Sequence, residues 1–373
     1  MNRARDLDGL RFIAAVTVIL RHTGEYPELP DGWGGLIRVS VRWCVPFFFL
    51  VFGYCLCEPE RADGDGVGRN GVGRDGAGRG GTDRGGPAIP LERVARIARM
   101  FAVASLLYLP LMIAKGATPI SEIGPALLLT GTWYHLWFLS ALCLALVVIA
   151  AVSQAPGGGR LLDLAAGIIL AAFVALDVAM SLDGSYGGAL DLARQAQGIA
   201  LVWLGYRLAR ARIRPAGPAI AALVLGGVAL TFLDVFVLER FGAHMSWRQC
   251  SPGAILVAVG LLLWGVKGTI RLPEWMVWMG SRHAFAIYIL HPLFVAAAGV
   301  AVAGLSGGAR PSLAIAALAL LATLAAAEGL RRYLPSARAV MDGRLPDRTG
   351  GRPAGEGRAA GRAEGQAAAS AGV

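Results

Sequence analysis

The chain has 373 residues, of which 55% are hydrophobic and only 16% are charged, and its mean hydropathy is +0.57. A soluble globular domain carries about 25% charged residues, so this composition excludes that class and predicts a membrane protein. The formal net charge of +10 also occurs in nucleic-acid binders, but here the arginines lie in short clusters between long apolar runs. We therefore interpret them as topology signals and expect no nucleic-acid partner.

About ten apolar stretches have the length of a membrane-spanning helix, roughly 17–25 residues. The first opens with charged residues and lacks a small-residue cleavage site, so we expect it to remain in the mature protein. The sequence thus predicts an all-α, polytopic membrane helix bundle of about ten transmembrane helices, with the lipid bilayer as its surroundings. The stretches lie near residues 9–25, 41–57, 97–114, 135–153, 161–181, 193–210, 218–238, 252–267, 283–304 and 311–330.

Lysine and arginine are distributed unevenly between the predicted loops. Most lie at the two termini and in alternate loops around 58–99, 160, 207–214 and 267–282. Cytoplasmic loops carry the excess of positive charge, so we expect a multi-pass protein of the cell (inner) membrane with both termini in the cytoplasm. The opposite loops hold few basic residues, among them Arg38, Lys115, Arg240, Arg248 and Arg310.

Two segments differ from the rest in composition: the Gly/Arg-rich stretch 60–88 and the Gly/Ala/Arg-rich tail 342–373. Both lack the apolar residues that a core needs, which predicts a flexible cytoplasmic loop and a disordered cytoplasmic tail. The membrane domain is then residues 1–341. The GxG matches in the loop do not follow a strand, so they do not indicate a dinucleotide site.

The cysteines and histidines show no metal-binding spacing. The five cysteines form no paired CxxC arrangement, and the five histidines form neither HxxxH nor HExxH. We expect no metal ion and assign the cysteines no chemistry. His244 and His283 lie in loops or at span ends, and we assign them no function.

The first apolar stretch carries two polar side chains, Arg11 and His22, eleven positions apart. At ~100° per residue this spacing is about three turns plus ~20°, so both side chains share one helix face. At ~1.5 Å per residue, their Cα atoms lie ~16 Å apart along the axis, roughly half of a ~30 Å hydrocarbon core. Polar groups at this depth face the bundle interior or a wet cavity and mark a candidate site.

These two residue types suit acyl chemistry. An imidazole titrates near neutral pH, so His22 is able to take a proton from an alcohol or to be acylated itself. Arg11 supplies positive charge for a phosphate or for a developing oxyanion. Two alternatives remain open on spacing alone. Both residues could be interfacial boundaries of the span, or gating and proton-relay residues of a polytopic transporter or flippase.

Further motifs follow in order along the chain. The segment Leu7–His22 (LDGLRFIAAVTVILRH), with Arg, ten residues and then His, resembles the opening of the acyltransferase family 3 integral membrane proteins. The resemblance covers roughly residues 5–330, and it implies a membrane-embedded O-acyltransferase. It continues at Val45–Tyr54 (VPFFFLVFGY), Arg93-Val-Ala-Arg96, His135-Leu-Trp-Phe-Leu139 and Tyr288-Ile-Leu-His291.

The resemblance implies transfer of an acyl group, usually acetyl, from cytosolic acyl-CoA to a hydroxyl of a carbohydrate or other cell-envelope or secreted acceptor. In such a protein Arg11 serves donor binding and His22 catalysis, and the pair Arg93 and Arg96 is associated with activity. Acyl-CoA is then a co-substrate, and no bound cofactor is expected. Arginine also pairs bidentately with phosphate, which suits binding of the CoA diphosphate. The alternative for this pair is a positive-inside cluster extended by Arg99.

The remaining candidates have weaker support. His135, Trp137, Tyr288 and His291 lie near span ends, either as an interfacial belt or as the lining of an acceptor pocket. Asp177 and Asp234 lie inside apolar runs, so each either belongs to a site or pairs with an arginine on another span. The family commonly has Ser-Gly in its second-span motif, whereas this chain has Phe52-Gly53. A mechanism that needs that serine is therefore in doubt, although the histidine-based one is not.

Overall fold

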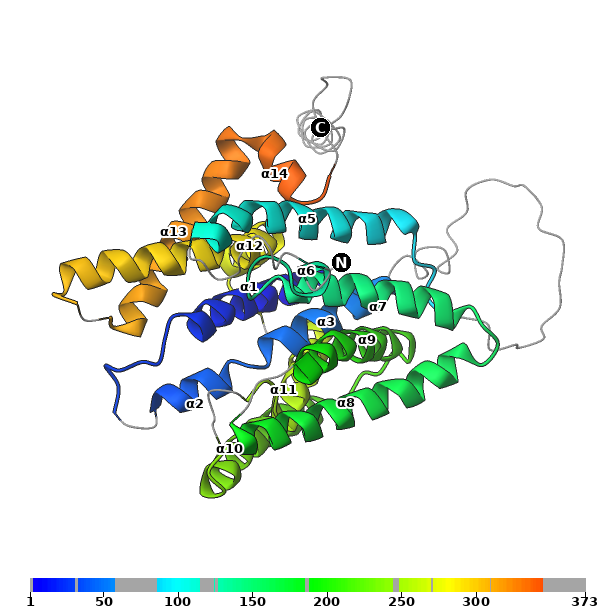
Figure 1. Ribbon diagram of the computed structural model, residues 1–373. Coiled ribbons are helices and arrows are strands. Elements are labelled where there is room, and N and C mark those ends of the chain that lie inside the picture. The colour runs from blue at the N-terminus through cyan, green and yellow to red at the C-terminus, as the bar shows by residue number, and fades with distance from the viewer. Residues whose placement is uncertain are drawn as a thin grey trace, which may run out of the picture.

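The structure is a computed structural model that describes residues 3–30, 33–57, 86–114, 124, 127–184, 188–243, 248–269, 271–308 and 310–344. Within these ranges the secondary structure is helical and contains no strand. Of the predicted flexible segments, the structure describes only residues 86–88 of the loop and 342–344 of the tail. The helices are α1 (Arg3–His22), α2 (Trp33–Ser40), α3 (Cys44–Leu56), α5 (Leu91–Ala114), α6 (Leu127–Thr130), α7 (Trp137–Ser153), α8 (Gly158–Asp183), α9 (Gly188–Arg210), α10 (Gly217–Arg240), α11 (Pro252–Lys267), α12 (Glu274–Leu305), α13 (Ser312–Tyr333) and α14 (Pro335–Met341) (Figure 1).

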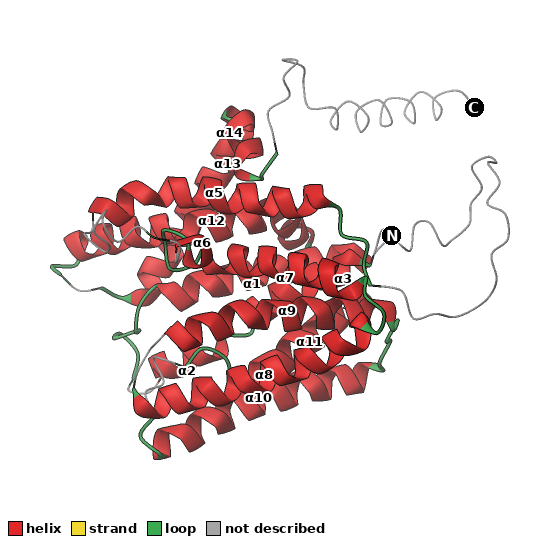
Figure 2. Ribbon diagram, turned by 45° about the vertical axis from the view of Figure 1, so that its right-hand side comes forward, coloured by secondary structure: helices red, strands yellow, loops and turns green. Residues whose placement is uncertain are grey.

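The long helices coincide, in order, with the expected spans, and they run roughly parallel to one another in Figure 2. The prediction of an all-α membrane bundle is confirmed. Helices α7 and α11 are shorter but apolar. Within the described residues, six segments are long and apolar enough to cross a membrane: Trp33–Leu56, Leu91–Ala114, Gly158–Asp183, Gly217–Arg240, Glu274–Leu305 and Ser312–Tyr333.

The spans differ in how much of their apolar surface is covered by protein. In α8 and α10 only 22% of the most apolar stretch is buried, whereas 67% is buried in the span Trp33–Leu56. Leu164 on α8 and Phe236 on α10 are more than half exposed. Exposed apolar side chains of this kind are favourable in contact with lipid, whereas a large apolar patch is unfavourable in contact with water. Helices α8 and α10 therefore lie at the periphery of the bundle, and α3 lies in its centre.

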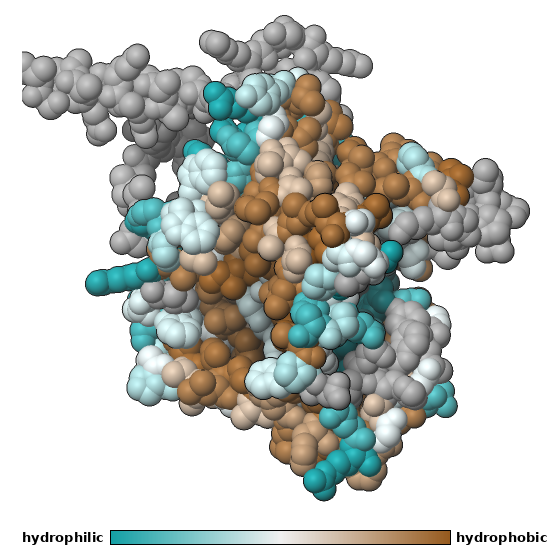
Figure 3. Space-filling view, turned by 90° about the vertical axis from the view of Figure 1, so that its left-hand side faces the viewer, coloured by the Kyte–Doolittle hydropathy of each residue, from teal (hydrophilic) through white to brown (hydrophobic). Residues whose placement is uncertain are grey.

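One end of the bundle holds the start of α1, and the opposite end holds His22, where α1 stops. Figure 3 views that opposite end, which is on the left in Figure 1, and shows hydrophobic residues over much of it with hydrophilic ones in patches. Helix α1 packs along α12, and α3 packs along α9. The face of α1 that packs on α12 is thus covered by protein along the helix.

Glycines permit the closest helix crossings. A Cβ atom on Gly53 of α3 would overlap the carbonyl oxygen of Val202, and one on Gly205 of α9 would overlap that of Leu50. On α12, a Cβ atom on Gly280 would overlap the carbonyl oxygen of Asp8 on α1. Small residues drive helix association in membranes because they let backbones approach. The Phe52-Gly53 motif therefore has a packing explanation for its glycine.

We predict that Gly53→Ala and Gly205→Ala each destabilise the bundle by about 1–3 kcal/mol, because the added methyl group forces α3 and α9 apart. The measurement is thermal unfolding of the purified protein in detergent. Gly167→Ala is the matched control, since a Cβ atom there meets nothing within 4 Å. Equal melting temperatures for Gly53→Ala, Gly205→Ala and Gly167→Ala would contradict the close crossing.

Candidate functional site

Helix α1 carries Arg11 and His22 into two different cavities. Arg11 lines a cavity of about 490 Å³ at the end of the bundle where α1 begins. His22 lines a second cavity, of about 320 Å³, at the opposite end. We call them the arginine cavity and the histidine cavity. The eleven-residue spacing on one helix thus corresponds to two separate sites.

The arginine cavity combines a cationic rim with an apolar wall. Its one carboxylate among the described residues, Asp342, accepts a hydrogen bond from Nε of Arg338 at 3.2 Å. The apolar wall includes Phe48, Phe52 and Tyr288. Phe52, the residue that departs from the family pattern, therefore faces this cavity with an aromatic ring in place of a hydroxyl. The arginines of the cavity are Arg11, Arg93, Arg96, Arg282, Arg338 and Arg344.

The segment after α14 completes this cavity by packing on α5. Nε of Arg96 donates to the carbonyl oxygen of Asp342 at 2.9 Å, and Nε of Arg99 donates to that of Gly343 at 2.9 Å. Gly343 has a φ of +69°, a left-handed conformation that favours glycine. Residues 342–344 therefore belong to the cavity wall, three residues beyond the predicted domain edge at 341.

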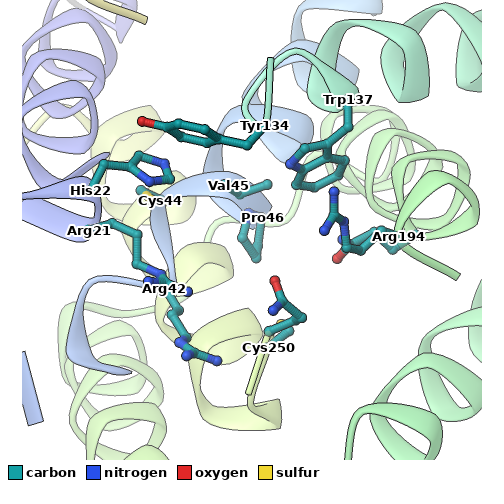
Figure 4. A pocket seen from close by; sticks show the side chains of 12 residues that line it. Arg21, His22, Arg42, Cys44, Val45, Pro46, Tyr134, Trp137, Arg194 and Cys250 are labelled. Carbon is teal, nitrogen blue, oxygen red and sulfur yellow. The ribbon is translucent and has the colours of Figure 1, made fainter. Parts of the chain in front are cut away.

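The histidine cavity is cationic too. In Figure 4, Arg21, Arg42 and His22 lie on one side of it, and Arg194 lies on the other beside Trp137. The Arg194 guanidinium carbon lies 4.6 Å from the centre of the Trp137 ring, which is a cation–π distance. The full lining is Arg21, His22, Arg42, Cys44, Val45, Pro46, Tyr134, Trp137, Arg194, Gln197, Gln249 and Cys250.

The His22 ring contacts two other rings. Its centre lies 4.8 Å from that of Tyr134 and 5.4 Å from that of His291, with an angle of 26° between the two imidazole planes. Nδ1 of His291 lies 3.0 Å from the carbonyl oxygen of Ile287 and 2.9 Å from that of Tyr288. A carbonyl only accepts, so Nδ1 carries a proton and Nε2 is the acceptor nitrogen of the neutral ring. Hydrogen bonds to these two backbone carbonyl groups thus hold the ring of His291, the stacked partner of His22, in one orientation.

The four residues considered for the acceptor pocket occupy different places. Trp137 lines the histidine cavity and Tyr288 lines the arginine cavity. His135 and His291 are buried and line neither. The Tyr288 hydroxyl donates to the carbonyl oxygen of His135 at 2.6 Å, and the His135 ring centre lies 5.4 Å from that of His291. His135, Tyr288 and His291 thus form, together with His22, a ring cluster between the two cavities.

The sequence profile of a known family, described as an acyltransferase domain, matches residues 5–328. The chain belongs to acyltransferase family 3. The family resemblance inferred from the sequence motifs is therefore confirmed. With its apolar helices, the chain is a multi-pass membrane acyltransferase.

Two curated relatives of this acyltransferase are amino-acid racemases of Enterococcus faecalis. One is 24% identical over 140 residues, which are 36% of this chain and 16% of the racemase. The other is 25% identical over 162 residues, which are 42% of this chain and 20% of the racemase. The match thus covers a fifth or less of each racemase. It therefore does not indicate racemase activity in this chain. No solved structure matches the acyltransferase.

A buried ion-pair network holds one wall of the histidine cavity of this acyltransferase. Arg248, which is fully buried, contacts Asp177 of α8 at 2.7 Å and Asp234 of α10 at 2.9 Å. Asp177 also accepts the backbone N–H groups of Gln249 and Cys250, at 2.8 and 2.9 Å. Of the two interpretations of these aspartates, pairing with an arginine is the one that the structure shows. That arginine comes from the segment before α11 rather than from another span.

The Cys250 thiol of the histidine cavity is not a candidate nucleophile. Burial raises the pKa of the Cys250 thiol to about 12, so the thiol stays protonated and is a poor nucleophile. Within the ranges that the structure describes, no group of three or more His, Cys, Asp or Glu side chains is placed to hold a metal ion. His22 is therefore the candidate reactive group of the histidine cavity.

Several cavity residues had no signal in the sequence. Arg282, Arg338 and Arg344 are three arginines among the 35 Lys and Arg residues of the chain, and no spacing connects them with Arg11. Arg194 of α9 likewise had no motif. Its place directly before Gln195 and three residues before Gln197, inside an otherwise apolar span, was the available hint, because charge at membrane depth marks a site.

We predict that Arg248→Met destabilises the acyltransferase by about 3–5 kcal/mol, because two buried carboxylates lose their shared counter-ion. The free energy of unfolding in detergent is the measurement. Arg240→Met, which removes an exposed arginine from the same end of the bundle, is the control. Adding Asp177→Asn and Asp234→Asn to Arg248→Met should recover part of the loss, and unchanged stability of Arg248→Met alone would contradict the network.

Proposed function

We propose that this acyltransferase moves an acyl group, usually acetyl in its family, from cytosolic acyl-CoA to a hydroxyl of a carbohydrate or other cell-envelope or secreted acceptor. The observation that carries the proposal is the placement of Arg11 and His22 on one helix, in two cavities at opposite ends of the bundle. The donor enters the arginine cavity, and the acceptor enters the histidine cavity.

The composition of the arginine cavity supports a coenzyme A donor. Coenzyme A carries a diphosphate and a third phosphate, and guanidinium groups bind phosphate through paired hydrogen bonds. Arg11, Arg93 and Arg96 lie on the lining together with three further arginines. The apolar wall formed by Phe48, Phe52 and others suits the uncharged acyl end of the molecule. Phosphates then stay at the rim while the thioester points toward the ring cluster.

The charge distribution supports an orientation in an inner membrane. The arginine cavity opens at the end where α1 begins, and the loops at that end carry most of the basic residues of the chain. The positive-inside rule places this end, and both termini, in the cytoplasm, where acyl-CoA is made available. The histidine cavity then faces the outside, where cell-envelope glycans are found.

His22 performs the proton transfer in this proposal. The acceptor hydroxyl gives its proton to the imidazole as its oxygen attacks the thioester carbonyl carbon, the carbon–sulfur bond breaks, and the proton passes to the departing CoA thiolate. In the alternative route the imidazole nitrogen attacks first, CoA leaves, and the acyl-imidazole is then transferred to the hydroxyl. Both routes need an unprotonated nitrogen on His22, whose ring the stacked His291 supports.

We predict that His22→Ala lowers acyl transfer at least ~100-fold, the smaller end of what a general base contributes. The assay measures CoA release by the purified protein with acetyl-CoA and supplied acceptor. Thermal unfolding of the variant shows that it is folded. Undiminished turnover would remove His22 from the mechanism, and a wild-type protein that consumes no acyl-CoA would favour a carrier function instead.

We predict that Arg11→Gln, Arg93→Gln and Arg96→Gln each raise KM for acetyl-CoA about 10-fold, the effect of one lost charged hydrogen bond. The test is to repeat the kinetics with acetyl-pantetheine, which lacks the phosphates, so that the variants should then match the wild type. Arg214→Gln is the control, because Arg214 is exposed at the same end and lies outside the cavity. Equal losses with both thioesters would contradict phosphate binding.

A further inference from the structure

The histidine cavity presents guanidinium groups and no carboxylate. Arg21, Arg42 and Arg194 line it, while its described lining contains no Asp or Glu. Arg42 is only 4% exposed, and the Arg194 side chain is 14% exposed. Three guanidinium groups in the lining of one small cavity give it a positive potential that attracts an anion.

Two carboxylates near the cavity are each paired with an arginine. Asp191 pairs with Arg194 at 3.4 Å, and Asp177 is engaged by Arg248, as described above. Neither of these aspartates lines the cavity. Arg21 makes no ion pair with a carboxylate in the part of the chain that the structure describes. A molecule inside the cavity therefore contacts guanidinium groups directly, whereas these aspartates do not line the cavity.

The polar groups that complete the lining also suit an anionic, hydroxyl-rich molecule. The side-chain amides of Gln197 and Gln249 offer both donors and acceptors to hydroxyl groups. Trp137 gives a flat apolar surface, and Arg194 is held over it by the cation–π contact. In Figure 4, Arg194 lies across the cavity from His22. An anion bound by Arg194 would thus lie away from the reacting hydroxyl.

We propose that the acyl acceptor is an anionic saccharide, which carries a carboxylate or a phosphate on or beside the sugar that is acylated. This inference rests on the proposed function and specifies its acceptor. Arg194 binds the anion across the cavity from His22, and Arg21 and Arg42, on the side of His22, add positive charge that attracts it. The same three cations disfavour a positively charged acceptor.

The test uses the purified full chain with acetyl-CoA and three acceptors: methyl β-D-glucuronoside, glucose 6-phosphate and neutral methyl β-D-glucoside. We expect kcat/KM to be roughly 10- to 100-fold higher for one or both anionic acceptors than for the glucoside. Arg194→Gln should remove most of this preference, because it lowers kcat/KM for the anionic acceptors far more than for the glucoside. Arg240→Gln, an exposed arginine outside the cavity, should change neither. The comparison of the first two acceptors separates carboxylate from phosphate recognition.

Binding of the same three sugars, measured by microscale thermophoresis without acyl-CoA, gives a readout independent of turnover. Equal or better use of the neutral glucoside, or no saturable binding of either anionic sugar, overturns the proposal. An equal loss for all acceptors in Arg194→Gln also overturns it, because it indicates a role in charge stabilisation of the transition state. Failure of the wild type to consume acetyl-CoA overturns the proposed function instead, while the binding arm still decides whether the cavity selects anions.

Discussion

Polar side chains within the membrane must face the interior of the protein, because lipid provides no hydrogen-bond partner. In this acyltransferase that constraint acts on α1 first. Arg11 and His22 share one face of a helix that packs along α12, so both side chains open into protein cavities. The same constraint explains Arg248, which is fully buried and satisfied by two aspartates from different helices. The charged side chains named here thus lie where they line a cavity or form an ion pair inside the protein.

Close helix crossings give the cavities their fixed geometry. Gly53 and Gly205 bring α3 and α9 into backbone contact, and Gly280 does the same for α12 and α1. Since helix backbones at such crossings cannot slide without a clash, the groups that they carry keep their mutual positions. His22 and His291 come from α1 and α12, and their stacked rings are a direct consequence of that packing. The ring cluster then lies between the arginine cavity and the histidine cavity.

Much of the fold was predictable because membrane spans are encoded locally. A run of about twenty apolar residues predicts a helix without reference to any partner, which is why the expected spans coincide with helices. The Arg11–His22 spacing was equally local, since helix periodicity alone places both on one face. The family assignment followed from ordered motifs on these spans. In contrast, the distinct positions of His135, Trp137, Tyr288 and His291 depend on side-chain direction and helix rotation, which apolar runs do not encode.

The sequence by itself determined the class of protein, the order of its helices, the family and the helix face that carries Arg11 and His22. Those properties depend on composition, periodicity and short motifs. Only the tertiary structure decided that Arg282, Arg338 and Arg344 join Arg11 in one cavity, and that Arg42 and Arg194 line the cavity of His22. The physical reason is that guanidinium groups from helices far apart in sequence meet only when packing brings those helices together, and no local pattern records which helices become neighbours.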